Sequence, residues 1–486
     1  MDQNNGGIIG KINTPTTSVA SGVWSLDSQF DSQSSSVWPL AFPQTTFTNS
    51  CRFNKADTDY LSKTFSGDSN RRTFTYSCWV KKCTTSSGGA LFGVTGSGGG
   101  YIWFLLSGTV LYLQNNPSST VQFQPTQQIR DLSAFMHILL AIDTTQSTST
   151  DRVKLYINGE QVTSFSTSTY PSLNQDLQLV TGTNPIKIGE YGGEKLDAYL
   201  SEVIWVDGQQ LTPTSFGATN PVTNIWEPIA YTGTYGTNGF KLNFSDSSNL
   251  GDDTSGNGND FTVNNLTSVD QSTDTPSNNF ATFNPLIPNS NITYSQGNLD
   301  ILRDSGGDNR IALSTIAVSS GKWYVEMKCV QNQDATHYGI VATDSAYSTS
   351  NSLAQMENAY AYKNDGTVQE YNQSNIDTGE ATFTTGDIIG IALDMDNNKI
   401  YFHKNGTYIN SGDPAGNSNG YSITANKEYY FARAQNYATG KTSANFGSPS
   451  FSISSGNSDA NGHGNFEYSV PSGYYALNTK NLAEFG

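Results

Sequence analysis

The sequence is poor in charged residues, in cysteine and in long apolar runs. Only 14 % of its 486 residues are charged, and Gly, Ser, Thr and Asn take their place, which is typical of all-β proteins with many turns. No run approaches the ~18 apolar residues that a membrane helix needs. The N-terminus lacks a basic segment followed by an apolar core, so we expect neither membrane insertion nor a secretory signal.

The charge balance is strongly acidic. A net charge of −17 would repel phosphate backbones, which argues against nucleic acid as a partner. The four cysteines, Cys51, Cys78, Cys83 and Cys329, lack the paired spacing of a zinc site. We expect them to be buried free thiols, and a Cys51–Cys78 bridge is the open alternative.

The first 44 residues show no persistent strand or helix pattern. They are rich in Gly, Ser and Thr and carry isolated aromatic residues. Two interpretations are open: a disordered tail, or an extended arm whose aromatic side chains dock on another subunit. We favour the arm, with Trp24 and Trp38 as its anchors, because tryptophan is costly to leave in water and common at interfaces.

From residue 45 onward, apolar residues recur with the period of two that β-strands require. The stretch RTFTYSCWVKK places Phe74, Tyr76 and Cys78 on one face and Trp79 on the other. Met136–Asp143 is apolar almost throughout, as expected of a strand that is covered on both sides. Helical periodicity is nearly absent, so the sequence predicts antiparallel sheets packed face to face.

The domain boundaries follow from where these strand patterns start and stop. Residues between the two strand-rich blocks are rich in turn formers and poor in core residues. We therefore predict an all-β protein with two tandem β-sandwiches. Its segments are an arm (1–44), a first sandwich (45–245), a connector (246–295), a second sandwich (296–447) and a C-terminal segment that packs on the second sandwich (448–486).

Two groups of motifs resemble known families. The first block resembles laminin-G-like, concanavalin A-like domains through FTYSCWVKK, VKLYINGEQV and LDAYLSEVIWVDGQQLTPTSFG. The second block resembles the SPRY domain through SSGKWYVEMKC, YGIVA, YKNDGTV and GDIIGIALDMDNNKIYFHKNG. The resemblance implies two jelly-roll sandwiches that serve as recognition modules. Together with the connector and the closing PSGYYALNTKNL, the pair resembles a type of bacteriophage virion protein found among marine phages.

This resemblance implies a non-enzymatic virion protein that is exposed on the particle surface, in several copies or as a homo-oligomer. We expect residues 1–44 to attach to other virion proteins. We expect the sandwiches to bind a host-surface glycan or protein, as part of a tail fibre or adsorption appendage. Two alternatives stay open: a capsid decoration protein without receptor binding, and a polysaccharide depolymerase.

A depolymerase would need two carboxylates about 5–10 Å apart across a cleft. The acidic candidates near the end of the first sandwich are Glu190, Glu194, Asp197 and Glu202. Residues two apart on a strand share a face, and Glu202 has no acidic residue at that distance. The template fails, so we predict that the chain is not an enzyme.

The histidines are scattered and suggest no catalytic or metal cluster. His137 begins an apolar strand and is expected to be a packing residue. His403 alternates with Ile400 and Phe402 along its strand, so we expect it to point away from the core and to be exposed.

Calcium is the one candidate ion, and no cofactor is required by these patterns. The acidic turn that starts at Asp394 fails as an EF-hand loop, because its sixth residue is Lys399 and its twelfth is Asn405. We interpret that turn as the corner between two strands. The connector loop DSSNLGDDTSGNGND is the better calcium candidate, and its expected ligands are Asp246, Asn249, Asp252 and Asp253.

Loop tyrosines are the candidate ligand-binding residues of the second sandwich. Aromatic faces stack on sugar rings, and neighbouring amides and carboxylates bind hydroxyls. The alternative is that these rings only cap the sandwich. The candidates are Tyr347, Tyr371, Tyr421 and Tyr437.

Overall fold

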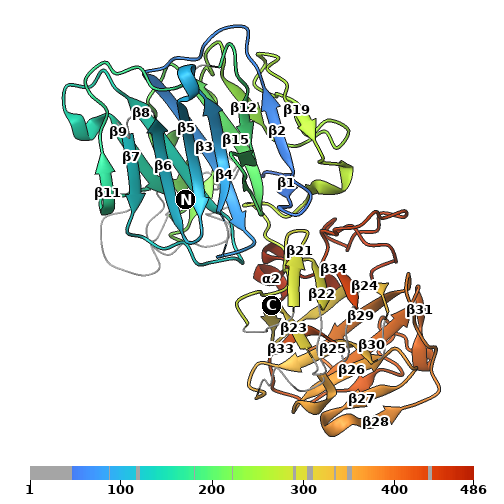
Figure 1. Ribbon diagram of the computed structural model, residues 1–486. Helices are drawn as coiled ribbons and strands as arrows, with labels where there is room; N and C mark the ends of the chain where they lie inside the picture. The colour runs from blue at the N-terminus through green and yellow to red at the C-terminus, as the bar shows by residue number, and fades with distance from the viewer. Residues whose placement is uncertain are drawn as a thin grey trace, which may run out of the picture.

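The computed structural model confirms the predicted all-β class for the part of the chain that it describes (Figure 1). Strands form two tandem sandwiches, and the described residues contain one short α-helix, α2 (Thr479–Phe485). No described helix is long and apolar enough to cross a membrane. The arm lies outside the described residues, which are 46–86, 88–116, 121–179, 181–221, 223–287, 292–303, 310–332, 335–346, 353–435 and 440–486.

The first sandwich consists of two antiparallel sheets. In one sheet the strand order is β10 (Glu160–Gln161), β9 (Val153–Ile157), β8 (Met136–Asp143), β3 (Thr73–Lys82), β15 (Ala198–Asp207), β1 (Ser50–Phe53) and β20 (Gln271–Ser272), and β18 (Phe240–Leu242) pairs with β15. In the other sheet the order is β11 (Phe165–Thr169), β7 (Val121–Pro125), β6 (Val110–Asn116), β5 (Tyr101–Ser107), β4 (Gly88–Thr95), β12 (Ile186–Ile188), β2 (Tyr60–Lys63) and β19 (Thr262–Asn264).

Alternation on β3 places one set of side chains in the core between these sheets, as predicted. Phe74, Tyr76 and Cys78 are fully buried there, and Trp205 of β15 stacks on Phe74 with ring centroids 4.5 Å apart. Trp79, on the opposite face, is also buried because loops cover the outside of this sheet. The cysteines are buried free thiols, so the Cys51–Cys78 bridge does not form.

The second sandwich also consists of two sheets. In one sheet the strand order is β21 (Ile292–Ser295), β22 (Asp300–Arg303), β34 (Lys441–Asn445), β24 (Lys322–Gln331), β29 (Ile388–Asp394), β30 (Lys399–Lys404) and β31 (Thr407–Tyr408), with β32 (Tyr421–Ser422) on β30 and β35 (Tyr475–Ala476) on β24. In the other sheet the order is β23 (Arg310–Val318), β33 (Tyr429–Gln435), β25 (Thr336–Ala342), β26 (Ala359–Lys363), β27 (Val368–Glu370) and β28 (Ser374–Asp377).

The acidic turn at Asp394 is the corner between β29 and β30, as the sequence predicts. Asp394 pairs with Lys399 across the hairpin. Both oxygens of the Asp394 carboxylate accept hydrogen bonds from Asn397, at 2.9 Å each, and Lys322 lies 2.9 Å away as a cation partner. Asn398 adopts the left-handed backbone that asparagine tolerates. The acidic groups therefore build the turn.

Residues in the expected connector contribute strands to the first sandwich. Val263 of β19 pairs with Leu61 of β2, and Gln271 of β20 pairs with Cys51 of β1. The chain then crosses to the second sandwich, where Phe283 is fully buried. The region 246–295 thus extends both sheets of the first sandwich before it crosses over.

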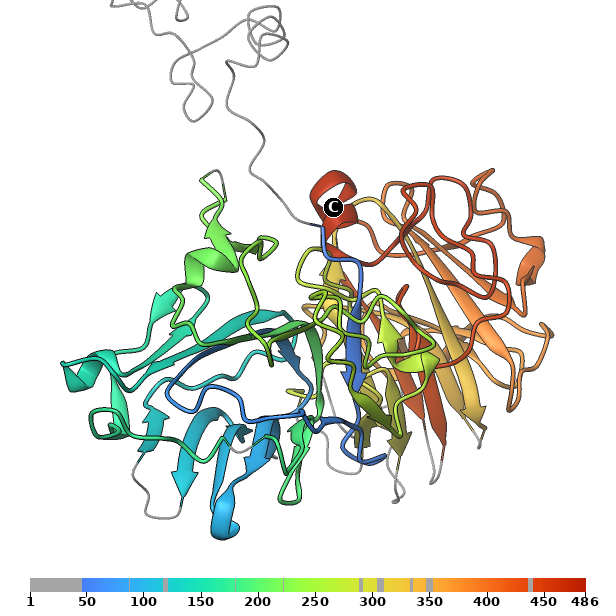
Figure 2. The same cartoon turned by 90° about the horizontal axis from the view of Figure 1, so that it is seen from above.

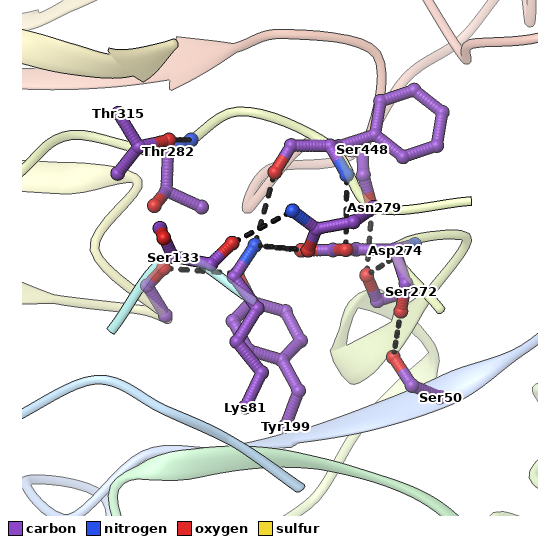
Figure 3. Close-up of polar contacts among 12 residues, drawn as sticks. Ser50, Lys81, Ser133, Tyr199, Ser272, Asp274, Asn279, Thr282, Thr315 and Ser448 are labelled. Carbon is purple, nitrogen blue, oxygen red and sulfur yellow. Dashed lines mark hydrogen bonds and ion pairs between the residues drawn. The ribbon is translucent and has the colours of Figure 1, made fainter. Parts of the chain in front are cut away.

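A buried group of polar contacts, the polar joint, links the two sandwiches where the chain crosses (Figure 3). The Lys81 ammonium of β3 donates to Asp274 Oδ2 at 2.8 Å, to Asn279 Oδ1 at 2.9 Å and to the Phe280 carbonyl at 2.9 Å. Ser272 and Ser448 share a hydrogen bond of 2.7 Å. Lys81 and Asp274 are each only 1 % exposed, so the pair is shielded from water.

His403 is buried, and the prediction that it is exposed was wrong. Its side chain points to the face of β30 that is turned away from the core, as expected. The C-terminal segment, however, covers that outer face. The His403 ring packs edge-on against Tyr468 with centroids 5.3 Å apart. Its Nδ1 accepts from the Gly406 N–H at 3.1 Å, so its Nε2 donates to the Tyr324 hydroxyl at 2.7 Å. His137 is a buried packing residue, as predicted.

We expect His403 to make the protein sensitive to acid. Burial lowers the pKa of His403 to about 3, whereas an unfolded histidine titrates near 6.5. Its contribution to the free energy of unfolding is complete above about pH 6.5 and is lost as the pH falls toward 3, at about 1.4 kcal/mol per pH unit. In a His403→Gln variant this part of the slope should vanish in urea titrations at pH 7, 6 and 5. An unchanged slope would contradict the assignment.

Candidate functional site

One solvent-facing surface of the first sandwich gathers half-buried aromatic and amide side chains. We call it the Trp103 face, and it lies on β4, β5, β6 and β7, which Figure 1 labels side by side. Alternation along β5 sends Ile102 and Phe104 into the core and leaves Tyr101 and Trp103 on the outside. Its members are Tyr101, Trp103, Tyr112, Gln114, Gln122 and Tyr191.

Strand register places these side chains in a row across the sheet. Gln122 of β7 pairs with Gln114 of β6, which pairs with Trp103 of β5, which pairs with Gly93 of β4. A β-carbon at Gly93 would lie 2.2 Å from the Tyr191 ring, closer than real contacts allow. Glycine there lets the Tyr191 ring, from β13 (Glu190–Tyr191), lie over the sheet beside Trp103.

The rings of the Trp103 face support one another. The Trp103 ring centroid lies 4.6 Å from Tyr101 and 5.9 Å from Tyr191, which it meets edge-on at 86°. The Tyr101 hydroxyl donates to Gln114 Oε1 at 3.1 Å, and Gln122 Nε2 donates to the Tyr112 hydroxyl at 2.7 Å. Such contacts hold rings and amides in fixed positions before a ligand arrives, which reduces the entropy cost of binding.

The hydroxyls and charges of this face suit a neutral, hydroxyl-rich ligand. Burial raises the pKa of Tyr112 and of Tyr191, so both hydroxyls remain protonated donors at neutral pH. Lys187, which lies near Tyr191, is neutralised by Glu190 at 2.7 Å and lies 4.7 Å from the centre of the Tyr60 ring. Aromatic faces stack on the apolar sides of sugars, and amides bind sugar hydroxyls.

A second candidate is a cleft of about 360 Å³ on the second sandwich, the Tyr371 cleft. Tyr371 is 51 % exposed at its rim, and the next residue, Asn372, adopts a left-handed backbone. Inside, the Tyr360 hydroxyl shares a hydrogen bond of 3.1 Å with the Thr424 side chain. The lining residues are Glu357, Asn358, Tyr360, Glu370, Tyr371 and Thr424.

Of the four tyrosines predicted to bind a ligand, Tyr371 is the one that the structure shows exposed beside a cleft. Tyr421 is only 8 % exposed; its ring packs near Phe402, and its hydroxyl donates to Asp377 Oδ2 at 2.6 Å. In this position the Tyr421 ring is packed in the core, and ligand binding by Tyr421 stays a prediction. Tyr347 and Tyr437 lie outside the described residues, as do Trp24 and Trp38.

The predicted calcium loop uses its oxygens within its own turns. Asp253 accepts hydrogen bonds from the backbone of Lys241, Ser255 and Asn259. Asp246 Oδ1 accepts from the Ser248 backbone and hydroxyl, and Asn249 Oδ1 accepts from the Gly251 N–H at 3.3 Å. Asp252 is partly exposed. Within the described ranges, no group of three or more His, Cys, Asp or Glu side chains is placed to hold a metal ion. Calcium binding by this loop stays a prediction.

Two of the acidic residues considered for hydrolysis form ion pairs with lysines. Glu202 sits at a bulge of β15 with a left-handed backbone and ion-pairs with Lys241 at 2.9 Å. Glu190 ion-pairs with Lys187. Burial raises the pKa of Asp197 to about 6. Glu202 and Glu190 each face a lysine, which is the arrangement of structural ion pairs.

Our sequence reasoning missed the Trp103 face. The signal was present in YIWFLLSGTVLYLQNN and VQFQP, where aromatic and glutamine residues alternate with buried apolar ones. Alternation alone predicts which residues point outward on each strand, but it does not say which strands are neighbours. Gln122, Gln114 and Trp103 can be placed in one row only when the pairing register of β7, β6 and β5 is known.

Comparison with family models finds two matches, one in each sandwich. Residues 55–215 match the concanavalin A-like lectin/glucanases superfamily, and residues 322–431 match the SPRY domain. Both domain resemblances expected from the motifs are therefore confirmed. The Trp103 face falls within the first match and the Tyr371 cleft is built largely within the second. No curated protein matches the chain.

Comparison with solved structures gives likenesses of low sequence identity. The SPRY domain of human HERC1 is 20 % identical over 33 % of this chain and 96 % of its own, with a TM-score of 0.26. A protein from Bacteroides ovatus ATCC 8483, provisionally described as a carbohydrate binding protein, is 15 % identical over 47 % of this chain, with a TM-score of 0.31. The chain spans 60 % of that protein's length.

Proposed function

We propose that this chain is a non-enzymatic recognition protein that binds a neutral glycan on the Trp103 face. The observation that carries the proposal is the row of glutamines and stacked rings held in fixed positions by the register of β4 to β7. The match of this sandwich to a superfamily of lectins and glucanases supports a glycan as ligand. The lysine partners of Glu190 and Glu202 support binding over hydrolysis.

Replacing Trp103 with alanine should weaken glycan binding by roughly thirtyfold, the effect of losing an aromatic anchor worth about 2 kcal/mol. The full chain is screened on a glycan array, and the best neutral oligosaccharide is then titrated by calorimetry. Tyr371→Ala is the matched control and should leave this affinity unchanged, because Tyr371 lies on the other sandwich. Binding that survives Trp103→Ala in a folded protein would exclude this face.

The second sandwich supplies a second binding function in the proposal. The exposed Tyr371 ring, two nearby carboxylates and a cleft of about 360 Å³ favour a polar or basic peptide segment of a protein partner. A protein captured by the full chain but lost on Tyr371→Ala would support this role. Retention of that protein by the Tyr371 variant would count against it.

We further propose that both modules act on the surface of a phage particle, as part of a tail fibre or adsorption appendage. The motif pairing described above is the support for this context. Gold-labelled antibodies against the protein should mark purified particles at their tails and block adsorption to cells. Label confined to the capsid shell would favour a decoration protein, and release of reducing sugar from host polysaccharide would favour a depolymerase.

A further inference from the structure

A recess of about 350 Å³ lies between the first sandwich and the C-terminal helix, and it shares no lining residue with either candidate site. We call it the Trp226 recess. Its walls come from β17 (Trp226–Pro228), from the turn before β8 and from the start of α2. The residues that matter here are Trp79, Phe135, Ile225, Trp226, Ser277 and Thr46.

The Trp226 recess suits an apolar occupant. Its wall includes Ile225, which is 59 % exposed, an unusual amount for a residue beside an aromatic wall. Two polar groups of its walls already have partners: the Trp226 Nε1–H donates to His137 Nδ1 at 3.3 Å, and the Asn279 amide donates to the Ser133 carbonyl at 2.7 Å. Neither of these two groups is left to bind the hydroxyls of a ligand, whereas the Ile225 side chain and the rings of Trp79, Phe135 and Trp226 offer apolar surface.

The described chain begins at the rim of this recess. Thr46 lines it, and the next residue, Phe47, is buried and donates its N–H to Ser277 Oγ at 3.0 Å. Figure 2 shows this start of the described chain close to α2, whose residues Thr479 and Lys480 also line the recess. The first described residues are therefore fixed at the recess.

The sequence just before that point is apolar and rich in aromatic and proline residues. Residues 37–43 read Val-Trp-Pro-Leu-Ala-Phe-Pro. Trp38 is eight residues from Thr46, so it can reach at most about 28 Å from the rim. Such a short tether corresponds to a millimolar effective concentration, and two prolines lower the entropy cost of holding the segment extended.

We propose that residues 37–43 dock in the Trp226 recess of the same chain, with Trp38 or Phe42 against Ile225 and Trp226. Apolar side chains then cover the exposed wall, and the start of the arm is fixed to the first sandwich. Residues 1–36, including Trp24, are left to reach another subunit. The docked segment sets the direction in which the arm leaves the protein.

Photocrosslinking in the full chain tests this. The photoreactive residue p-benzoylphenylalanine replaces Trp38 or, as a matched position, Trp24. We expect the probe at 38 to label peptides that contain 134–135, 225–228 or 479–480, and the probe at 24 to label them at least about tenfold less. Labelling of other surfaces by the probe at 38, or equal labelling from both positions, would overturn the proposal.

Two further experiments test whether the crosslinks depend on the recess and whether they form within one copy of the chain. Ile225→Asp places a charge on the recess wall without removing core packing, and it should lower the crosslinking yield roughly tenfold. Leu173→Asp is the matched control, because Leu173 is similarly exposed at 52 % but does not line the recess. Mixing ¹⁵N-labelled and unlabelled protein distinguishes crosslinks within one copy of the chain from crosslinks between two copies. Crosslinks within one copy support the proposal, and crosslinks between copies overturn it.

Discussion

Replacing Lys81 with methionine is expected to lower the free energy of unfolding by about 3–5 kcal/mol, because it leaves the buried Asp274 carboxylate without its cation. The methionine side chain fills a similar volume, so the loss comes from charge and hydrogen bonding. Three acceptors in the polar joint lose their donor at once: Asp274, Asn279 and the Phe280 carbonyl. Urea titration followed by tryptophan fluorescence measures the effect.

Two control variants show how much of the lost free energy of unfolding comes from the burial of the Lys81–Asp274 pair and how much from the uncompensated charge of Asp274. Lys427→Met removes a lysine that also pairs with an aspartate, Asp344, but on the surface; we expect a loss below about 1 kcal/mol. In Lys81→Met/Asp274→Asn the uncompensated charge is gone, while the new amide oxygen at position 274 can still accept from the Phe280 N–H. About half of the loss should return. A loss below about 1 kcal/mol for Lys81→Met itself would show that the joint contributes little to holding the sandwiches.

Features set by local chemistry could be predicted from the sequence. The turn at Asp394 depends on hydrogen bonds between residues three apart, and the core face of β3 depends on alternation along one strand. Both were predicted correctly for that reason. The two family resemblances rest on the same kind of information, because their motifs are continuous strands and turns.

Features set by distant partners could not be predicted. His403 was predicted to be exposed because nothing near it in the sequence indicates that Tyr468 returns to cover it. Gly390, which pairs with His403 on the neighbouring strand, is a hint that the His403 ring lies flat over the sheet. A β-carbon at position 390 would lie 1.9 Å from His403 Nε2. The short strands β19 and β20 look like turns because their few residues gain strand geometry only from pairing with β2 and β1.

The candidate site illustrates the same limit. Outward-pointing aromatic residues could be read from β5 and β6 separately, but a binding face requires their lateral order. In the second sandwich, Tyr421 and Tyr371 have similar polar neighbours in the sequence. Their environments in the structure differ. Tyr421 packs in the core and its hydroxyl donates to Asp377, whereas Tyr371 is exposed and precedes Asn372, which has a left-handed backbone.

Glu326 carries the second large effect that we predict. Its carboxylate is fully buried and has no cation partner among the described residues, yet four donors converge on it. Oε1 accepts from the Tyr324 hydroxyl at 3.0 Å and the Tyr468 N–H at 2.8 Å. Oε2 accepts from the Glu467 N–H at 3.0 Å and the Asn445 amide at 3.1 Å. These bonds fix the C-terminal segment on the outer face of the second sandwich.

Glu326→Gln should therefore cost roughly 3 kcal/mol, because an amide nitrogen would face two donors that lose their acceptor. The loss should be local: the Glu467 and Tyr468 amides should exchange with deuterium far faster, while amides of β29 change little. Glu484→Gln, at an exposed carboxylate on α2, is the control and should stay within about 0.5 kcal/mol.

The pH dependence of the Glu326 effect has a definite sign. Burial raises the pKa of Glu326 in the folded protein, so the folded state binds a proton at a pH where the unfolded chain has released it. The Glu326 contribution to the free energy of unfolding is complete below the unfolded pKa of about 4.3 and is lost as the pH rises through the raised folded pKa. Wild-type protein should lose this increment between acidic and neutral pH, and Glu326→Gln should not. Parallel pH profiles for the two proteins would contradict the raised pKa.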